Sequence, residues 1–340
     1  MPVSARPEHS RRTASVEKQA ILRLAFAVTS ALVIGEWFGW HPTFLAPILT
    51  ATLVASLPGP LPIKAGILLI LVQAGGAYAA FALSSLLRDA PLVLFGSIGV
   101  IIFICFSLIA SGRAFLPLLL VLICFSTIPV VTMVSPEQGG ALPLAFVRGM
   151  VLTVAIMSLA YALWPRTALK ASAAPAPSLA APLAVAVAGT AIVLPLMLIF
   201  LMYGLTDALP VLITTVVIVL NFDPKRGLSQ SLAMMVGNFI GGTIAVSCYA
   251  VLQIAPSLTS LTLITLVMTM LFARGIHRGG ARAAVALVTL NQTIVMLSLS
   301  LMPASSPGIW LSRLLEFAIA CTFAISMMML LLPRADAQRR

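Results

Sequence analysis

The sequence contains few charged residues. Only 9% of its 340 residues are Asp, Glu, Lys or Arg, and 61% are hydrophobic. Soluble globular domains carry roughly 25% charged residues. A chain this apolar cannot cover a water-facing surface with polar groups, so its composition predicts an integral membrane protein that has lipid as solvent.

Motifs for metal, nucleotide or catalytic chemistry are also missing. The chain has three His and four Cys, and none of the cysteines is paired at metal-ligand spacing. It contains no HExxH motif and no GxxxxGK[ST] loop. We therefore predict no metal, no cofactor, no enzymatic activity and no ATP-driven step. The net charge of +11 does not indicate nucleic-acid binding, because the basic residues form short clusters between apolar runs.

Long apolar runs are the main feature of the chain. A helix that crosses a bilayer needs about 20 residues at 1.5 Å each. The sequence predicts an all-α membrane fold of about twelve transmembrane helices. The expected spans are residues 20–39, 43–60, 65–87, 91–111, 114–134, 142–164, 181–203, 207–222, 228–252, 257–273, 281–302 and 308–332.

The distribution of Lys and Arg predicts the orientation of these spans. With the N-terminus in the cytoplasm, sixteen Lys and Arg residues fall on the cytoplasmic side and only Arg88 on the other, while Arg23, Arg148 and Arg313 lie within spans. Such a bias follows the positive-inside rule. We therefore expect a multi-pass protein of the bacterial inner membrane, with both termini cytoplasmic and the first apolar run retained as a span.

The two halves of the chain resemble each other. Five short patterns recur in the same order about 161 to 169 positions later. The paired patterns are Pro47 with Pro210, Pro62–Lys64 with Pro224–Arg226, Gly75-Gly76 with Gly241-Gly242, Gly112-Arg113 with Gly280–Arg282, and Pro165-Arg166 with Pro333-Arg334. Since each half has an even number of spans, the sequence predicts two parallel six-helix repeats.

The repeats set the expected domain boundaries. Residues 1–19 form a cytoplasmic N-terminal tail, and residues 20–166 form the first six-helix membrane repeat. An Ala-, Pro- and Ser-rich cytoplasmic linker follows at 167–180. The second repeat covers residues 181–334, and residues 335–340 form the C-terminal tail.

Two arginines within the spans are the strongest candidates for function. Arg148 and Arg313 lie in the last helix of each repeat. An Arg at mid-bilayer costs about 2.5–3.5 kcal/mol on insertion scales, so such residues tend to face a cavity or a partner. One interpretation is a pair of cations that line an anion pathway. The other is that both side chains reach to the nearby interface.

Acidic residues offer further candidates. Glu316 follows Arg313 by three residues, a spacing that permits an ion pair along the helix. It also permits a protonatable carboxylate whose charge responds to the neighbouring cation. Glu36, near the outer end of the first span, fits an interfacial position.

Four amides in apolar helices complete the set. They are Gln73, Asn238, Asn291 and Gln292. Such amides form hydrogen bonds between membrane helices, which is the structural interpretation. Contact with a substrate is the functional one.

The opening segment AFAVTSALVIGEWFG, the proline-bearing second span and the small-residue-rich third span carry a family resemblance. Over residues 20–334 the chain resembles the fusaric acid resistance and aromatic acid exporter superfamily, and it looks most like the compact family DUF2955. The resemblance implies an inner-membrane efflux component for aromatic or other organic anions. It also implies a HlyD-like periplasmic adaptor protein as partner.

The plant aluminium-activated malate transporters look like distant relatives with one six-span unit per chain. They pass anions between subunits, which makes a homo-oligomer one alternative for this chain. Larger exporters carry sizeable cytoplasmic domains after their helical blocks, whereas this chain has short segments in those places. Our first hypothesis is a proton-coupled exporter of organic anions. The alternatives are a passive anion channel and a non-transporting membrane subunit of an efflux complex.

Overall fold

The computed structural model describes most of the chain. The described residues are 6–57, 59–113, 115–165, 182–204 and 227–301, with short pieces at 212–213, 215–216, 322–323 and 326–327. The expected spans at 207–222 and 308–332, the linker at 167–180 and the tail at 335–340 lie wholly or largely outside these residues.

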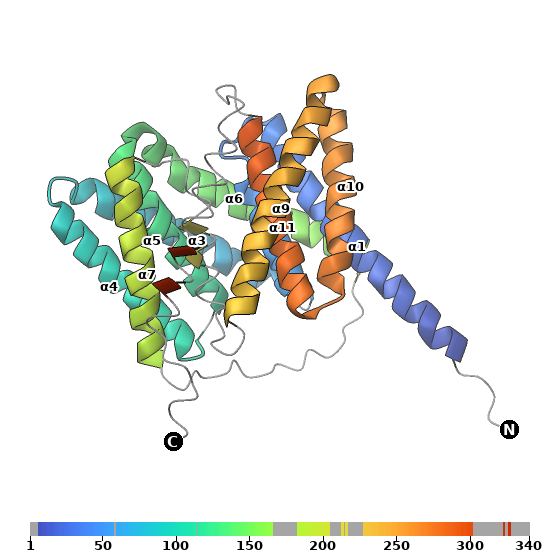
Figure 1. The fold of residues 1–340 in the computed structure, drawn as a ribbon, viewed down its shortest axis with the longest axis horizontal. Coiled ribbons are helices and arrows are strands. Elements are labelled where there is room, and N and C mark those ends of the chain that lie inside the picture. Colours follow the sequence, from blue (N-terminus) through green and yellow to red (C-terminus); the bar gives the residue numbers. More distant parts are fainter. Residues whose placement is uncertain are drawn as a thin grey trace, which may run out of the picture. The chain divides into compact units, whose positions relative to one another are not determined.

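The described residues form helices and no strands (Figure 1). The helices are α1 (Arg6–Trp37), α2 (Leu45–Ser56), α3 (Ile63–Leu86), α4 (Pro91–Ala110), α5 (Phe115–Val134), α6 (Pro136–Leu163), α7 (Pro182–Tyr203), α9 (Gly227–Ile254), α10 (Leu258–His277) and α11 (Gly280–Ser300). Nine of them are long and apolar enough to cross a membrane. The prediction of an all-α multi-pass membrane protein is confirmed for the described residues.

Helix α1 begins earlier than expected. We predicted a span from residue 20, but the helix already starts at Arg6. Its candidate membrane-spanning part is Val16–Trp37. The preceding residues therefore continue the helix beyond the apolar segment.

Helix α2 is shorter than the span predicted at 43–60. It has 12 residues, from Leu45 to Ser56, and thus a length of about 18 Å. The next residue, Leu57, has extended backbone angles (φ −88°, ψ 131°), as expected for a residue that precedes a proline. Three prolines within the LPGPLP segment at 57–62 prevent the helix from continuing. Helix α2 alone is therefore shorter than a bilayer core of about 30 Å, and a crossing at 43–60 would include the extended residues that follow it.

The chain divides into two compact units. Unit 1 comprises Met1–Gly66, Arg148–Ser172 and Val236–Pro307, and unit 2 comprises Ile67–Val147, Ala173–Met235 and Gly308–Arg340. Each unit thus combines segments from both halves of the sequence. Unit 1 holds α1, α2, the second part of α6, most of α9, and α10 and α11. Unit 2 holds nearly all of α3, then α4, α5, the first part of α6, and α7.

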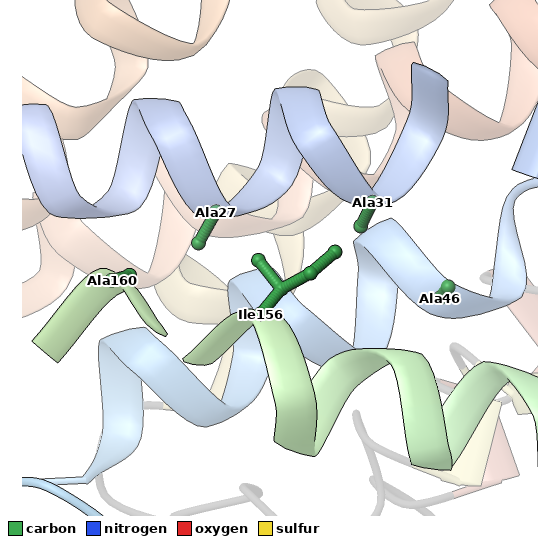
Figure 2. Packing of buried hydrophobic residues seen from close by; sticks show 5 residues of the cluster. All are labelled: Ala27, Ala31, Ala46, Ile156 and Ala160. Atoms are coloured by element: carbon green, nitrogen blue, oxygen red, sulfur yellow. The ribbon is translucent and has the colours of Figure 1, made fainter. Parts of the chain in front are cut away.

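In unit 1, α1 packs against α2 and α10, and α11 packs against α2 and α10. Small side chains allow α1, α2 and α6 to approach closely. Figure 2 shows Ile156 of α6 projecting towards α1, near Ala27 and Ala31. Ala46 of α2 and Ala160 of α6 complete this buried cluster. The contact relies on shape, as expected between membrane helices that gain little from a hydrophobic driving force.

In unit 2, α4 packs against α5 and α7, and α5 packs against α7. Glycines in α4 and α7 leave room for large side chains of the facing helix. A Cβ built on Gly99 of α4 would lie 2.9 Å from Leu194 Cδ1, and one on Gly189 of α7 would lie 3.0 Å from the ring of Phe106. Each of the two helices thus contributes one glycine that accommodates a large side chain of the other helix.

Four described glycines have positive φ, and each follows the end of a helix. They are Gly39 (φ 62°), Gly112 (φ 78°), Gly204 (φ 65°) and Gly279 (φ 74°). Each amide donates to the carbonyl three residues earlier, and this left-handed cap is a conformation that glycine adopts without steric cost. Gly39 precedes Gly204 by 165 positions, and Gly112 precedes Gly279 by 167. Both distances fall within the offset of the sequence repeat.

Candidate functional site

An arginine and an aromatic ring meet at the turn between α1 and α2 in unit 1. The amide of Trp40 donates to the Gly35 carbonyl (2.9 Å), which closes the α1 cap around Gly39. The cap places the Trp40 ring next to α6, where the Arg148 guanidinium carbon lies 5.7 Å from the ring centroid. A cation at this distance from an aromatic face is stabilised by the ring quadrupole.

A carboxylate and two hydroxyl groups lie at the same end of unit 1. Thr43 Oγ1 donates to Glu36 Oε1 (2.6 Å). The Oγ atoms of Thr43 and Ser298 are also in direct contact, which joins the turn to the end of α11. Thr43 and Ser298 are buried, at 2% and 1% exposure, whereas Glu36 is half-buried. The chain of polar atoms therefore leads from the carboxylate into the protein.

A second polar contact joins α2 to α11 further along the two helices. Asn291 Nδ2 donates to Thr52 Oγ1 (3.5 Å). Thr43 precedes Thr52 by nine residues, while its partner Ser298 follows Asn291 by seven, so the helices run antiparallel. We call the line of Thr43, Ser298, Thr52 and Asn291 the polar seam. It runs from the α1–α2 turn towards the end of α2 at Ser56.

Unsatisfied polar atoms lie at the end of the polar seam where Asn291 contacts Thr52. Asn291 Oδ1 and Gln292 Nε2 are buried, and neither has a hydrogen-bond partner among the described residues. Gln292 is 3% exposed. A buried polar atom without a partner costs roughly 1–3 kcal/mol, so this pair is a donor and an acceptor available to another group.

Helix α9 packs tightly beside these amides. A Cβ built on Gly241 would lie 2.6 Å from the Thr289 carbonyl oxygen and 3.0 Å from Gln292 Cβ. A Cβ on Gly237, one turn earlier, would lie 2.9 Å from Thr289 Oγ1. Thr293 Oγ1 also donates to the Gly241 carbonyl (3.1 Å). This GxxxG pattern brings the backbones of α9 and α11 together, as in other small-residue contacts of membrane helices.

The opposite side of α2 is fixed to α6. Thr153 Oγ1 donates to the Ala46 carbonyl (3.1 Å), and Thr50 Oγ1 lies 3.1 Å from Thr153 Oγ1. Gly149 lets the helices meet, since its Cβ would lie 3.5 Å from Leu45 Cβ. Helix α2 is thus held by hydroxyl contacts on two faces.

Four of the predicted site residues belong to unit 1. They are Arg148, Asn238, Asn291 and Gln292. Asn238, between Gly237 and Gly241 on α9, is buried at 4% exposure. Arg148 is exposed and lies beside Trp40. Arg313 and Glu316 lie outside the described residues.

Gln73 belongs to unit 2, whereas the four residues above belong to unit 1. It is fully buried on α3, and its Nε2 donates to Cys124 Sγ on α5 (3.3 Å). Its Oε1 has no partner among the described residues. Gly76, one turn later, packs against Val121 and Cys124, each 3.6 Å from its built Cβ.

Our reading of the sequence missed several residues of the site. Thr43, Thr52 and Ser298 were not singled out, because a hydroxyl can satisfy itself on the carbonyl of its own helix. Arg23 was placed within a span but given no role. It is 4% exposed, donates from Nη1 to the Trp164 carbonyl (3.1 Å), and lies 4.4 Å from the centroid of the Tyr161 ring. Arg23 thereby caps the end of α6.

The described part of unit 1 thus combines a cation with donors and acceptors. Arg148 contacts Trp40, which belongs to the same α1–α2 connection as Thr43, and the polar seam leads from Thr43 to the unsatisfied amides. Among the described residues no group of three or more His, Cys, Asp or Glu side chains could hold a metal ion.

One comparison with known proteins gives a match. A model of a family described as a protein of unknown function, DUF2955, matches residues 20–160. The match ends close to the boundary at 166 expected for the first repeat. No curated protein and no solved structure matches the chain.

Proposed function

We propose that this protein is an inner-membrane efflux transporter that exports aromatic or other organic anions in exchange for protons. The proposal includes the twelve-span arrangement of two parallel repeats with both termini cytoplasmic. It extends to a HlyD-like periplasmic adaptor as a partner.

The observation that carries the proposal is the position of Arg148. Its guanidinium carbon lies 5.7 Å from the centroid of the Trp40 ring, and Trp40 belongs to the same α1–α2 connection as Thr43, which meets Ser298. An arginine side chain offers five donors in a fixed fork that suits a carboxylate. The polar seam supplies further donors along α2 and α11. An anion that leaves through unit 1 would thus meet hydroxyls first and the guanidinium last.

The short helix α2 supports a pathway at this place. Backbone that is not helical is tolerated at membrane depth only where protein or a water-filled cavity surrounds it. Binding sites of secondary transporters lie at such interrupted helices near the bilayer midplane. Helix α2 ends after about 18 Å, and Thr52, the partner of Asn291, lies one turn before its end.

Contacts within unit 1 are consistent with the proposed orientation. Glu36, Thr43, Arg148 and Ser298 all fall at span ends that the charge bias assigns to the outer side. Arg23 and Trp164, which contact each other, fall at ends assigned to the cytoplasm. Helix ends expected on one side of the membrane therefore meet each other.

The two units also support the proposed duplication. Under the repeat, α1 corresponds to α7, α4 to α10 and α5 to α11. Unit 1 pairs α1 with α10 and α10 with α11, and unit 2 pairs α7 with α4 and α4 with α5. The same helix pairs thus form in both units, with the contributions of the two sequence halves exchanged.

Transport by Arg148→Gln tests the proposal. We expect the purified protein in liposomes to move a radiolabelled hydroxybenzoate along an imposed pH gradient. Arg148→Gln should lower the initial rate at least about ten-fold, because its amide carries no charge to attract the anion. Arg88→Gln is the matched control, since Arg88 is also exposed and is assigned to the outer side. Unchanged transport by Arg148→Gln would contradict the role of this arginine.

The pH gradient separates exporter from channel. An exchanger accumulates the anion against its own gradient when protons flow the other way, whereas a channel only equilibrates it. A wild-type rate that ignores the gradient would favour the channel, and no flux at all would favour the non-transporting subunit. A growth screen of a deletion strain against aromatic acids would then identify substrates.

A further inference from the structure

The turn between α10 and α11 carries a group of exposed basic side chains in unit 1. They are Arg274 and His277 in the last turn of α10, Arg278 at its C-cap and Arg282 in the first turn of α11. Both helices are long and apolar enough to cross a membrane, and their apolar segments end at His277 and begin at Arg282. The basic group therefore lies where two neighbouring spans reach the lipid headgroups.

Close packing of the two helices brings arginines of both to one level. Helices α10 and α11 lie side by side and are joined by a short turn, so they run antiparallel (Figure 1). A Cβ built on Gly275 would lie 3.0 Å from the Cβ of Ala286. Arg278 follows Gly275 by three residues, and Arg282 precedes Ala286 by four. These steps are about 4.5 Å and about 6 Å along the helices, so both arginines lie just beyond the contact, on the side of the turn. We call Arg274, Arg278 and Arg282 the basic turn.

The corresponding turn of unit 2 forms with less charge. Between α4 and α5, Gly112 has a φ of 78° and its amide donates to the carbonyl three residues earlier, as at Gly279 with a φ of 74°. That turn has one basic residue, Arg113, and the last turn of α4 has none. The same glycine-capped turn thus needs no cluster of arginines, and the additional charge in unit 1 requires another explanation.

The neighbouring helices of unit 1 do not offset the charge of the basic turn. Helices α2, α10 and α11 contain no acidic residue, and α9 contains none. Helix α1 packs against α10 and has two acidic residues in its segment 6–18, but four Lys or Arg residues accompany them. Net positive charge at the end of membrane spans attracts anionic lipids.

An exposed apolar stripe leads from the basic turn along α10. Leu263, Val267 and Leu271 are 57%, 56% and 60% exposed. Because successive helical residues are rotated by about 100°, these three share with Arg274 and Arg278 a face about 80° wide. One side of α10 thus offers apolar surface for acyl chains and cations at the level of a headgroup. A free phosphate ion would make no use of the stripe.

We propose that the basic turn binds the phosphate of an anionic phospholipid, whose acyl chains lie along the exposed stripe of α10. Guanidinium groups of Arg278 and Arg282 donate to the phosphate oxygens from two neighbouring helices. Arg274 adds a third positive charge one turn away. The bound lipid bridges α10 and α11 at their connection. This inference is independent of the proposed transport.

Lipid binding by the full-length protein tests the proposal. Native mass spectrometry in detergent compares dioleoyl phosphatidylglycerol, which is anionic, with dioleoyl phosphatidylcholine, which has the same chains and no net charge. We expect wild type to bind the anionic lipid at least about ten-fold more tightly, because three cations act on one headgroup. The preference should weaken as salt is added, since the basic side chains are exposed.

Charge variants of the basic turn provide the controls. The combined change of Arg274, Arg278 and Arg282 to Gln should abolish the preference, whereas their combined change to Lys, which keeps the charge, should retain most of it. Arg113→Gln removes the arginine of the corresponding turn in unit 2 and should behave as wild type. If the triple Gln variant does not fold, each single Gln variant should lower the affinity ratio about two- to five-fold.

The outcomes decide between a lipid site and its alternatives. Equal binding of the two lipids by wild type, or a preference that survives the triple Gln change, overturns the proposal. An equal loss in Arg113→Gln also overturns it, because the preference would then belong to the protein surface in general. Displacement of the lipid by millimolar inorganic phosphate would indicate a free-anion site instead. Loss of the preference in the Gln variants of the basic turn alone supports the lipid site, whatever the transport measurements show.

Discussion

The two units share a packing plan but differ in the polarity of their helix contacts. In unit 1, Gly241 of α9 packs on Thr289 and Gln292 of α11. In unit 2, Gly76 of α3 packs on Val121 and Cys124 of α5. Under the proposed repeat, α3 corresponds to α9 and α5 to α11. The Gly241-Gly242 pair thus meets a polar face in unit 1, and the Gly75-Gly76 pair meets a mainly apolar face in unit 2.

The same difference extends to other contacts. Unit 1 contains hydroxyl, amide and arginine contacts between helices, including Thr43 with Ser298, Asn291 with Thr52 and Arg23 with Trp164. The described contact of this kind in unit 2 joins Gln73 to Cys124. Under the proposed repeat, paired glycines thus recur at helix contacts of both units, while the polar groups between the helices differ.

Removal of Arg23 should give the largest effect on stability. Arg23→Leu deletes the Nη1 hydrogen bond to the Trp164 carbonyl and the contact with the Tyr161 ring. We expect the free energy of unfolding to fall by about 3 kcal/mol, because hydrogen bonds to charged groups and buried cation–π contacts both contribute. Denaturant unfolding in detergent micelles measures it. Arg113→Gln, an exposed arginine in the α4–α5 turn, should stay within about 0.5 kcal/mol.

Retained stability in Arg23→Leu would mean that the end of α6 is capped in another way. It would also remove arginine capping from the list of features that distinguish unit 1. A loss of unfolding free energy in Arg23→Leu no larger than that in Arg113→Gln would lead to the same conclusion.

Alanine at one glycine of each pair, Gly241 in α9 and Gly76 in α3, should give unequal effects. A Cβ on Gly241 would lie 2.6 Å from a backbone oxygen of Thr289, so α9 and α11 must separate. We expect Gly241→Ala to lower the free energy of unfolding by about 1–3 kcal/mol. A Cβ on Gly76 meets only ordinary contacts at 3.6 Å, so Gly76→Ala should be tolerated within about 0.5 kcal/mol. Thermal unfolding of both variants compares them, and similar losses would mean that the units pack alike.

Sequence patterns predicted most of the fold. Apolar runs of about 20 residues identified nine of the membrane-length helices, because lipid forces each span to satisfy its backbone internally. The length of α2 was wrong, since hydropathy does not show where a helix stops. The prolines after Leu57 carried that information, as did the glycine caps at Gly39 and Gly112, which patterning by hydropathy ignores.

The candidate site was predicted only in part. Arg148, Asn291 and Gln292 stood out because charges and amides are rare in apolar helices. Thr43, Thr52 and Ser298 did not, since their role depends on which helices are neighbours. The division into units brings α2 next to α11, and 239 positions separate Thr52 from Asn291 along the chain. Contacts across such distances follow from packing that a single sequence does not display.

The smallest expected effect concerns the amide contacts of the two units. A double-mutant cycle with Thr52→Val and Asn291→Leu should give a coupling of about 0.6 kcal/mol, the typical value for hydrogen bonds between membrane helices. The corresponding cycle in unit 2, with Gln73→Leu and Cys124→Ala, should give a smaller coupling, because a thiol sulfur is a weak acceptor. Unfolding in the same detergent measures both cycles. A larger coupling in unit 2 would contradict the view that polar contact between helices is concentrated in unit 1, and with it the reason to place the pathway there.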